Sequence, residues 1–596
     1  MSESVTFEEF DGVTLEQWQA KVEETTSLDR LCAQVDVTGT GGLATRPLYE
    51  AGTRAGGARA STAPWRVAQE YALQCPRAVA AALRTDVALG LDAAWVRLAP
   101  SLRARASAPG KGVAWVDREQ VSSIVEAAGA SALWIDAGAN GLSALSLLLE
   151  SSGSGSALGG VLCDPLGALA EHGGLGLALD EALAQTGRVL ARATVEAPQL
   201  RVLLASGLPY HDAGASASVE LGATLATLID TRRRLAEGGA DVEGLWPRTV
   251  LRVAAESDVF VSIAKVRALR WLAERVAARW GATEPAFVTV RTARRDRTRH
   301  DPRVNMLRAT AEAFSAATGG ADEVTVQPFS EVLGTPDADA RRWAITTSHM
   351  LREESHLAAA HDPAGGSGYV EALTRGIAER AWAWVQSVEK AGGMAATLSS
   401  GRVQSDVAGC ASARASALAT GRLALTGVSI FPQLDEPATP LGDDPSASAA
   451  LPTSEPVVSV PQMPVQRLAE PFERLRTAAD AAPHRPRAQL YVLGALKEHR
   501  ARLDFARSAV QVGGFAAEVV STTDDIVPAL AVLVASDERL ASEGATALAA
   551  LREAGAKAVW VACAPREGLE PDGFLHLRMD LPATLSTLHA AVEVER

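Results

Sequence analysis

The sequence has few cysteines, and they lie far apart. Only 5 occur in 596 residues, and no C-x-x-C pair is present. They are Cys32, Cys75, Cys163, Cys410 and Cys563. Disulfide frameworks and cysteine-rich zinc sites need closely spaced pairs. We therefore expect free thiols and a reducing, cytoplasmic location.

An excess of basic charge is also missing. Lys and Arg number 57 against 71 Asp and Glu, which gives a net charge of -14. This charge repels phosphate backbones and argues against a nucleic-acid partner. The first ten residues are acidic and lack the basic and apolar segments of a secretory signal. Apolar runs such as 530–535 fall far short of the roughly 20 residues of a membrane span, so we expect no membrane contact.

Short β-branched runs alternate with Ala- and Leu-rich helical stretches through the middle of the chain. Eight strand candidates are Ala94–Leu98, Val113–Val116, Ala132–Ile135, Gly160–Cys163, Arg201–Ala205, Val250–Ala254, Ala286–Val290 and Glu323–Gln327. Eight strands, each followed by a helix, within about 250 residues predict a (β/α)8 TIM barrel. We assign residues 91–431 to this barrel and the long helices after it, predicted over Ala344–Ala360 and Tyr369–Ala391.

The flanking segments differ in composition. Residues 1–90 are expected to form an N-terminal arm and extension, with an amphipathic helical arm over Trp18–Val35 and a turn at Thr38–Gly42. Residues 432–486 are rich in Pro, Ala and Ser and read as a linker. Residues 487–596 alternate five strand candidates with helices, which predicts a small doubly wound α/β domain. Those candidates are Ala488–Leu493, Glu518–Ser521, Leu530–Ala535, Ala558–Cys563 and Leu575–Arg578.

Three local patterns suggest chemistry, and each has a structural alternative. The Gly-rich stretch Asp362–Tyr369 could cradle a phosphate, or form a tight turn that caps the next helix. The histidines His349, His356 and His361 resemble a metal site, but their spacing does not place three imidazoles on one helical face. His211, beside Tyr210 and Asp212 just after a predicted barrel strand, is a candidate general acid or base, or a hydrogen-bonded structural residue.

A series of motifs then resembles one family. They are Arg46–Tyr49, Ser262–Ala268, Leu307–Ala313, Glu353–His356, Asp362–Glu371 and Val388–Met394. In this order they resemble methylmalonyl-coenzyme A mutase. The resemblance implies an N-terminal arm, an acyl-CoA-binding barrel, a linker and a flavodoxin-like cobalamin-binding-type domain. It also implies an adenosylcobalamin-dependent radical isomerisation of methylmalonyl-CoA and succinyl-CoA.

The cofactor motif that the resemblance implies is degenerate here. Catalytic members carry Asp-x-His-x-x-Gly, whose His ligates cobalt while the Asp accepts the second ring N–H. His499 keeps the ligand position, but Lys497 replaces the Asp and Arg502 replaces the Gly. Ser536 survives from the later Ser-x-Leu motif, whereas a Gly pair has become Ala562-Cys563. His499, as a cobalt ligand, and Ser536 are therefore weak cofactor-binding candidates, and a capping or exposed role is the alternative for His499.

The barrel motifs are degenerate as well. At the position of the family's catalytic Tyr this chain has Glu70, with Tyr71 one residue late. The segment around His211 is two residues shorter than the family's Tyr-His-Met-Gln-Glu-Ala-Gly motif, so His211 misses the catalytic position. Tyr71 and His211 remain the candidate catalytic residues.

Losses in both domains, with the scaffold motifs retained, are typical of the small subunit of a heterodimeric methylmalonyl-CoA mutase. We expect a non-catalytic chain whose large-subunit partner binds acyl-CoA and adenosylcobalamin. One alternative is a self-sufficient homodimeric acyl-CoA mutase that uses His499 as cobalt ligand. Another is an accessory mutase-binding protein that is not a permanent subunit.

Overall fold

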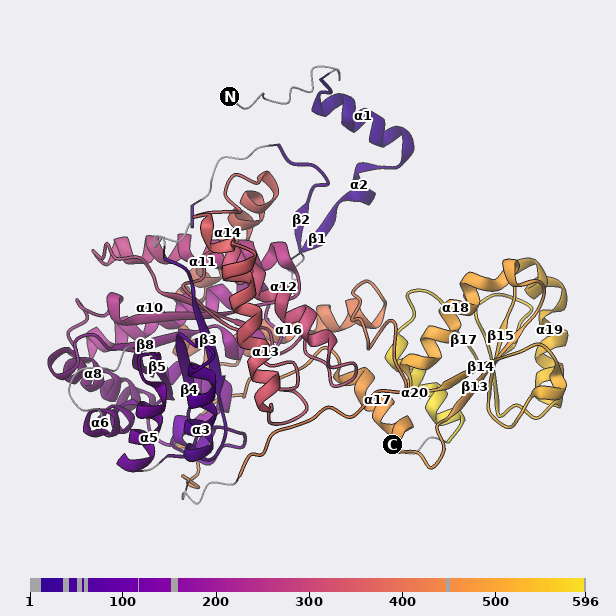
Figure 1. Cartoon of the computed structure of the whole chain (residues 1–596). Helices are drawn as coiled ribbons and strands as arrows, with labels where there is room; N and C mark the ends of the chain where they lie inside the picture. The colour runs from indigo at the N-terminus through magenta and orange to yellow at the C-terminus, as the bar shows by residue number, and fades with distance from the viewer. Residues whose placement is uncertain are drawn as a thin grey trace.

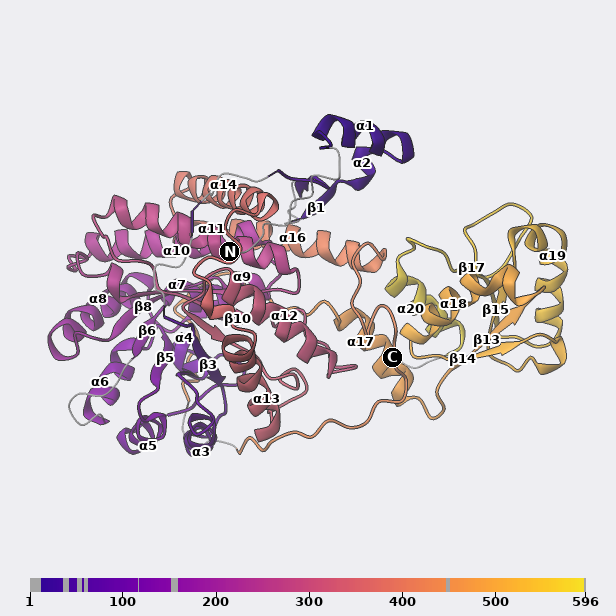
Figure 2. The same ribbon diagram turned by 45° about the horizontal axis from the view of Figure 1, so that its top comes forward.

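The computed structural model describes residues 12–35, 42–50, 56–57, 63–115, 117–151, 159–445 and 451–593. A helix-covered barrel forms the larger body, and a smaller α/β domain forms the C-terminal body (Figure 1). An N-terminal arm projects from the barrel. Turning the molecule shows the barrel beside the C-terminal domain, with the linker running between them (Figure 2). In the described part of the chain, no helix is both long and apolar enough to cross a bilayer.

Eight parallel strands close the barrel in the order β10-β11-β3-β4-β5-β6-β8-β9. Their bounds are β3 Arg66–Tyr71, β4 Ala93–Arg97, β5 Ala132–Gly138, β6 Gly159–Cys163, β8 Arg201–Ser206, β9 Thr249–Ala255, β10 Val288–Thr292 and β11 Glu323–Thr325. The helices of the barrel body are α3 Pro76–Val87, α4 Pro100–Ala104, α5 Arg118–Ala128, α6 Gly141–Ser151, α7 Pro165–His172, α8 Leu179–Glu196, α9 Leu208–Asp212, α10 Ala217–Glu237, α11 Val259–Arg279 and α12 Val304–Thr318. The predicted TIM barrel is confirmed.

One of the eight predicted strands is wrong. Val113 only forms an isolated bridge with Leu98, and Val116 lies outside the described residues. The missing strand is β3, which lies within the segment that the sequence assigned to the N-terminal extension. Strand β3 was not predicted because the charged residues Arg66 and Glu70 interrupt the apolar pattern that indicates a barrel strand.

The barrel interior is filled by aromatic side chains around one buried carboxylate. The indole N–H groups of Trp95 and Trp134 donate to Glu323 at 2.5 and 2.9 Å. The two indoles lie 5.7 Å apart between ring centroids, and Phe287 lies 5.6 Å from Trp134. Burial raises the pKa of Glu323, although both indole hydrogen bonds oppose that rise. This barrel is a packed core and not a channel.

Four further helices follow the barrel strands, at α13 Ala338–His349, α14 Gly368–Lys390, α15 Met394–Ser399 and α16 Arg402–Ala419. The predicted helix over Tyr369–Ala391 is confirmed as α14. The predicted helix over Ala344–Ala360 is wrong beyond His349, since a π turn spans Met350–Glu354. His356 then adopts a left-handed φ of 52°, which an α-helix cannot accommodate.

The C-terminal domain is a five-stranded parallel sheet of order β14-β13-β15-β16-β17. Its strands are β13 Arg487–Val492, β14 Ala516–Val520, β15 Leu530–Val534, β16 Ala558–Val561 and β17 Gly573–Phe574. Helices α18 Leu496–Val512 and α20 Leu581–Ala591 pack on one face, and α19 Asp537–Glu553 packs on the other. In chain order the strands lie 2-1-3-4-5, so the predicted flavodoxin-like fold is confirmed.

The linker contains more structure than its composition predicts. Strand β12 Val458–Ser459 pairs antiparallel with β7 Gly174–Leu175 of the barrel. Helix α17 Glu470–Ala481 buries Phe472 in the core of the C-terminal domain. Helix α17 was not predicted because the charged residues Glu473 and Arg476 occupy buried positions, where an amphipathic helix usually has apolar residues.

The N-terminal arm consists of two helices and a hairpin. They are α1 Leu15–Thr25, α2 Leu28–Leu31, β1 Ala33–Val35 and β2 Leu43–Thr45. The hairpin is anchored where Arg380 donates to the Gly42 carbonyl at 2.8 Å. Among the described residues, α1 and α2 contain no buried side chain. The predicted turn at 38–42 lies, except for Gly42, outside the described residues.

The Glu323 carboxylate predicts a measurable stability difference. Glu323→Ala leaves two buried indole donors without an acceptor, which costs about 3 kcal/mol, whereas Glu323→Gln retains one acceptor and costs less. Urea unfolding followed by tryptophan fluorescence measures the difference. The exposed Glu237→Ala is the control and should match wild type. Equal midpoints for Glu323→Ala and Glu237→Ala would contradict this account of the core.

Candidate functional site

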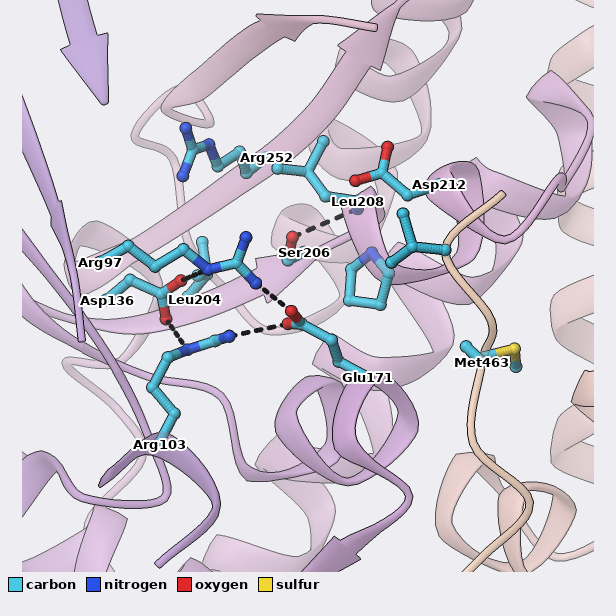
Figure 3. Close-up of a pocket in the computed structure, with 12 residues that line it drawn as sticks. Arg97, Arg103, Asp136, Glu171, Leu204, Ser206, Leu208, Asp212, Arg252 and Met463 are labelled. Atoms are coloured by element: carbon cyan, nitrogen blue, oxygen red, sulfur yellow. Dashed lines mark hydrogen bonds and ion pairs between the residues drawn. The ribbon is translucent and has the colours of Figure 1, made fainter. Parts of the chain in front are cut away.

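Ligands of TIM barrels bind at the carboxyl ends of the strands. Here that end carries a network of ion pairs (Figure 3). Arg103, from α4, donates to Asp136 at 3.0 Å and to Glu171 at 2.8 Å. Arg97, from the end of β4, also contacts Glu171. Burial raises the pKa of Glu171, but Arg103 and Arg97 outweigh this effect and hold it well below its usual value.

Two further ion pairs complete the network. Arg252 of β9 donates to Glu70 of β3 at 2.7 Å, and its guanidinium lies 3.7 Å from the ring centroid of Trp95. Arg291 of β10 donates to both carboxylate oxygens of Asp212, at 2.8 and 2.7 Å. Despite burial, Arg252 and its basic neighbours lower the pKa of Glu70 to about 2. Both carboxylates are therefore committed to structural pairs.

These pairs leave little room for a ligand. The hollow at the mouth is lined by Arg97, Arg103, Asp136, Glu171, Ser206, Asp212, Arg252, Met463 and Val465, among others, and has about 20 Å³ of space for water-sized molecules. That volume holds one or two waters. The four arginines of the network face four carboxylates, so their formal charges cancel. The hollow therefore offers a ligand little volume and, among these four arginines, no unpaired positive charge.

The structure places His211 away from this hollow. Its neighbours Pro209 and Asp212 line the hollow, whereas His211 Nδ1 lies 3.1 Å from Glu220 and the side chain is 0% exposed. Lys265 Nζ lies 2.7 Å from the same carboxylate. Burial and the nearby Arg295 lower the pKa of His211, which favours the neutral imidazole. Within the described structure His211 Nε2 has no hydrogen-bond partner, and the arrangement resembles the structural alternative more than a working acid or base.

Tyr71 lies on the other side of the barrel wall. Its hydroxyl donates to Asp86 of α3 at 2.8 Å, and Asp86 accepts from Arg341 at 3.0 Å. Successive strand residues point to opposite faces, so Glu70 faces the interior and Tyr71 faces the helices. The one-residue offset seen in the sequence has therefore moved the phenol out of the barrel, and Tyr71 cannot contact a ligand at the mouth.

The other two patterns have structural roles. In the Gly-rich stretch, Asp362 pairs with Arg267, Gly366 N–H donates to Glu371 and Ser367 caps α14. The loop is thus a tight turn whose donors serve the protein itself. Over the described ranges, no group of three His, Cys, Asp or Glu residues could hold a metal ion. The Nδ1 atom of His349 instead lies 3.3 Å from a guanidinium nitrogen of Arg352.

The C-terminal domain holds the candidate cobalt ligand in its first helix. His499 lies in the first turn of α18 and is only 4% exposed, so the expectation of an exposed or capping residue is wrong. Its Nδ1 is buried and lacks a hydrogen-bond partner among the described residues. Lys497 is exposed and offers no acceptor to the imidazole. Ser536 caps α19 by accepting from the Arg539 N–H at 3.3 Å.

The crevice between β13 and β15, where ligands of such sheets bind, is bridged by side chains. Arg502 donates to the Ala535 carbonyl and, at 3.0 Å, to Asp537. Arg539 donates to Glu498 at 2.9 Å, and a Cβ at Gly494 would lie 2.4 Å from atoms of both side chains. The family resemblance implies that the nucleotide tail of a cobalamin would occupy this space, and His499 lacks the carboxylate partner of the family motif. The residues present do not fit a corrinoid.

A closed parallel barrel joined to a doubly wound sheet of order 2-1-3-4-5 defines a two-domain α/β architecture in which both usual ligand positions are filled. A family model for methylmalonyl-CoA mutase matches residues 132–454. The methylmalonyl-CoA mutase small subunit of Streptomyces virginiae is 36% identical over 610 residues and covers 93% of both chains. That of Propionibacterium freudenreichii subsp. shermanii is 34% identical, over 65% of this chain and 63% of its own.

The chain therefore belongs to the methylmalonyl-CoA mutase family, and its curated relatives at this level of identity include small subunits.

Sequence reasoning missed the ion-pair network. Arg97, Arg103, Asp136 and Glu171 come from four separate elements, and each appears in the sequence as an isolated charge. The available signal was their position, because Arg97 is the penultimate residue of the predicted strand Ala94–Leu98 and Asp136 directly follows the predicted strand Ala132–Ile135. Only the closed barrel brings them within hydrogen-bond distance.

Asp164, at the carboxyl end of β6, predicts a pH effect on stability. It caps α7 by accepting from the Gly167 N–H at 2.8 Å, and burial raises its pKa to about 7. As pH rises, the Asp164 carboxyl loses its proton at a lower pH in the unfolded chain than in the folded chain. The free energy of unfolding therefore falls as pH rises from the ordinary pKa of 3.8 to about 7. Asp164→Asn keeps a capping oxygen and removes this titration.

Wild type and Asp164→Asn should be compared by urea unfolding at pH 5 and pH 8. Between pH 5 and pH 8 the variant should gain up to about 3 kcal/mol of stability relative to wild type, because about two pKa units of the window lie above pH 5, at ~1.4 kcal/mol per unit. A stability difference that is the same at both pH values would contradict the raised pKa.

Proposed function

We propose that this chain is the non-catalytic small subunit of an adenosylcobalamin-dependent methylmalonyl-CoA mutase. A large subunit of the same family would bind acyl-CoA and cofactor and interconvert methylmalonyl-CoA and succinyl-CoA. The small chain would stabilise that subunit. The observation that carries the proposal is the barrel mouth, where four arginine–carboxylate pairs fill the position of a substrate.

The second domain supports the same proposal. Arg502 bridges the crevice that a cofactor tail needs, and His499 is buried without a carboxylate to orient it. Defects in both ligand positions of one chain favour a supporting role over independent catalysis. The relatives named as small subunits agree with this assignment. All five cysteines are free, which suits a cytoplasmic complex.

The arm offers a surface for the partner. Leu15, Trp18 and Val22 of α1 follow helical spacing and are all half-buried, while the helix projects from the barrel (Figure 1). Ordering an isolated amphipathic helix costs conformational entropy that only burial of its apolar face offsets. We infer that this face packs on the large subunit.

Corrinoid absorbance tests the catalytic half of the proposal. The isolated chain, purified after incubation with adenosylcobalamin, should show no corrinoid spectrum because its tail crevice is bridged. The complex with the large chain should bind one cobalamin, and His499→Ala should leave that spectrum and the mutase activity unchanged. A corrinoid spectrum of the lone chain that His499→Ala abolishes would instead establish a self-sufficient enzyme.

Arm variants test the partner half. Trp18→Ser removes the largest apolar side chain of α1 and should weaken association with the large chain at least 10-fold, or about 1.4 kcal/mol, in analytical ultracentrifugation. Glu24→Gln, on the opposite face of the helix, is the matched control and should associate like wild type. If Trp18→Ser and Glu24→Gln associate equally well, the arm does not carry the contact.

A further inference from the structure

The linker contains a segment that lies against the barrel mouth, and we call residues 456–468 the strap. Its backbone amides donate to carbonyls of the barrel body at five points. The five bonds are Val457 to Leu175 at 2.7 Å, and Val460 to Gly173, Met463 to Ala170, Gln466 to Asp212 and Leu468 to Arg295, each at 2.9 Å. A tether that merely spans two domains would not need so regular a set of bonds.

Two glycines of the barrel make this close approach possible. A Cβ at Gly174 would lie 2.7 Å from Pro456 Cβ, and a Cβ at Gly173 would lie 2.9 Å from Gln462 Cβ. Real Cβ atoms do not approach so closely, so larger residues would push the strap away. The glycines after α7 therefore form a seat for the chain's own linker.

The strap also places side chains over the hollow. Met463 is 2% exposed and packs among the side chains of α7, α9 and α10, and it lines the hollow together with Val465. Figure 3 shows the strap, with Met463, passing the hollow on the side away from Arg97 and Asp136. Ser206, at the end of β8, lies beneath and is 5% exposed.

Both ends of the strap are fixed. Before it, Ser107 N–H donates to the Ser454 carbonyl at 2.8 Å. After it, α17 begins at once, and its Glu473 accepts from the Arg299 N–H at 2.6 Å. Movement of the strap would therefore require that the hydrogen bond of Ser107 to Ser454, the hydrogen bond of Arg299 to Glu473, or both be broken.

We propose that the strap is a built-in closure of the barrel mouth. The chain's own linker occupies the approach to the ion-pair network and keeps it shut, with or without a partner subunit. This proposal concerns whether molecules can reach the barrel mouth. The proposed small-subunit function concerns what the mouth can bind, so one proposal can be wrong while the other is right.

Hydrogen exchange of the full-length chain tests whether the strap is seated. Amides within 457–468 should be protected in wild type, and Gly174→Val should speed their exchange at least 10-fold while peptides of α10 stay unchanged. Gly244→Val is the matched control, because nothing lies within 4 Å of a Cβ there. If Gly174→Val does not fold, Gln466→Pro removes one strap donor without adding bulk to the barrel.

Thiol labelling tests whether the strap controls access. A Ser206→Cys side chain should react with a maleimide much more slowly than the exposed Cys32, as read by peptide mass spectrometry. Adding Gly174→Val, or Gln466→Pro, should speed labelling at position 206 at least 10-fold, whereas Gly244→Val should not. Labelling at 206 as fast as at Cys32 in the otherwise wild-type chain would overturn the proposal, as would strap exchange that neither variant changes.

Discussion

A charged group buried in a protein interior is stable only when an opposite charge and hydrogen-bond partners lie beside it. The barrel of this chain meets that requirement internally. Arg252 is matched by Glu70, Arg291 by Asp212, and Arg103 by Asp136 and Glu171. Each arginine that is paired with a carboxylate in this way is no longer available to bind a substrate, and the pair occupies space where a substrate could lie. At the barrel mouth, ion pairs that stabilise the fold occupy the space that a ligand would need.

The residues that carry the family resemblance serve the scaffold. Lys265 lies 2.7 Å from Glu220 with both side chains fully buried. Arg267 pairs with Asp362 and Glu371, which joins two of the resembling motifs across the barrel helices. Glu312, from a third motif, accepts two hydrogen bonds from Arg297. Such pairs preserve the fold whether or not a ligand binds, so the motifs identify the family through its scaffold.

The sequence predicted the architecture well because hydrophobic periodicity survives in most elements. Four of the five C-terminal strands and seven of eight barrel strands were found from it. The predicted strand Leu575–Arg578 is wrong, because β17 ends at Phe574 and residues 577–578 form a turn. Strand β3 and helix α17 were missed for one physical reason: Glu70, Glu473 and Arg476 are charged residues in buried or nearly buried positions, made stable by partners distant in sequence. Tyr71 and His499 show the complementary limit, since spacing located them but could not reveal that one faces the helices and the other is buried.

The central claim is that the barrel is a filled core without a substrate site, and equilibrium dialysis of the isolated full-length chain against labelled methylmalonyl-CoA tests it most directly. The account predicts equal ligand concentrations on both sides of the membrane, apart from weak binding that does not saturate. Saturable binding of one acyl-CoA per chain, lost on Arg252→Ala, would show that the mouth opens and would contradict it.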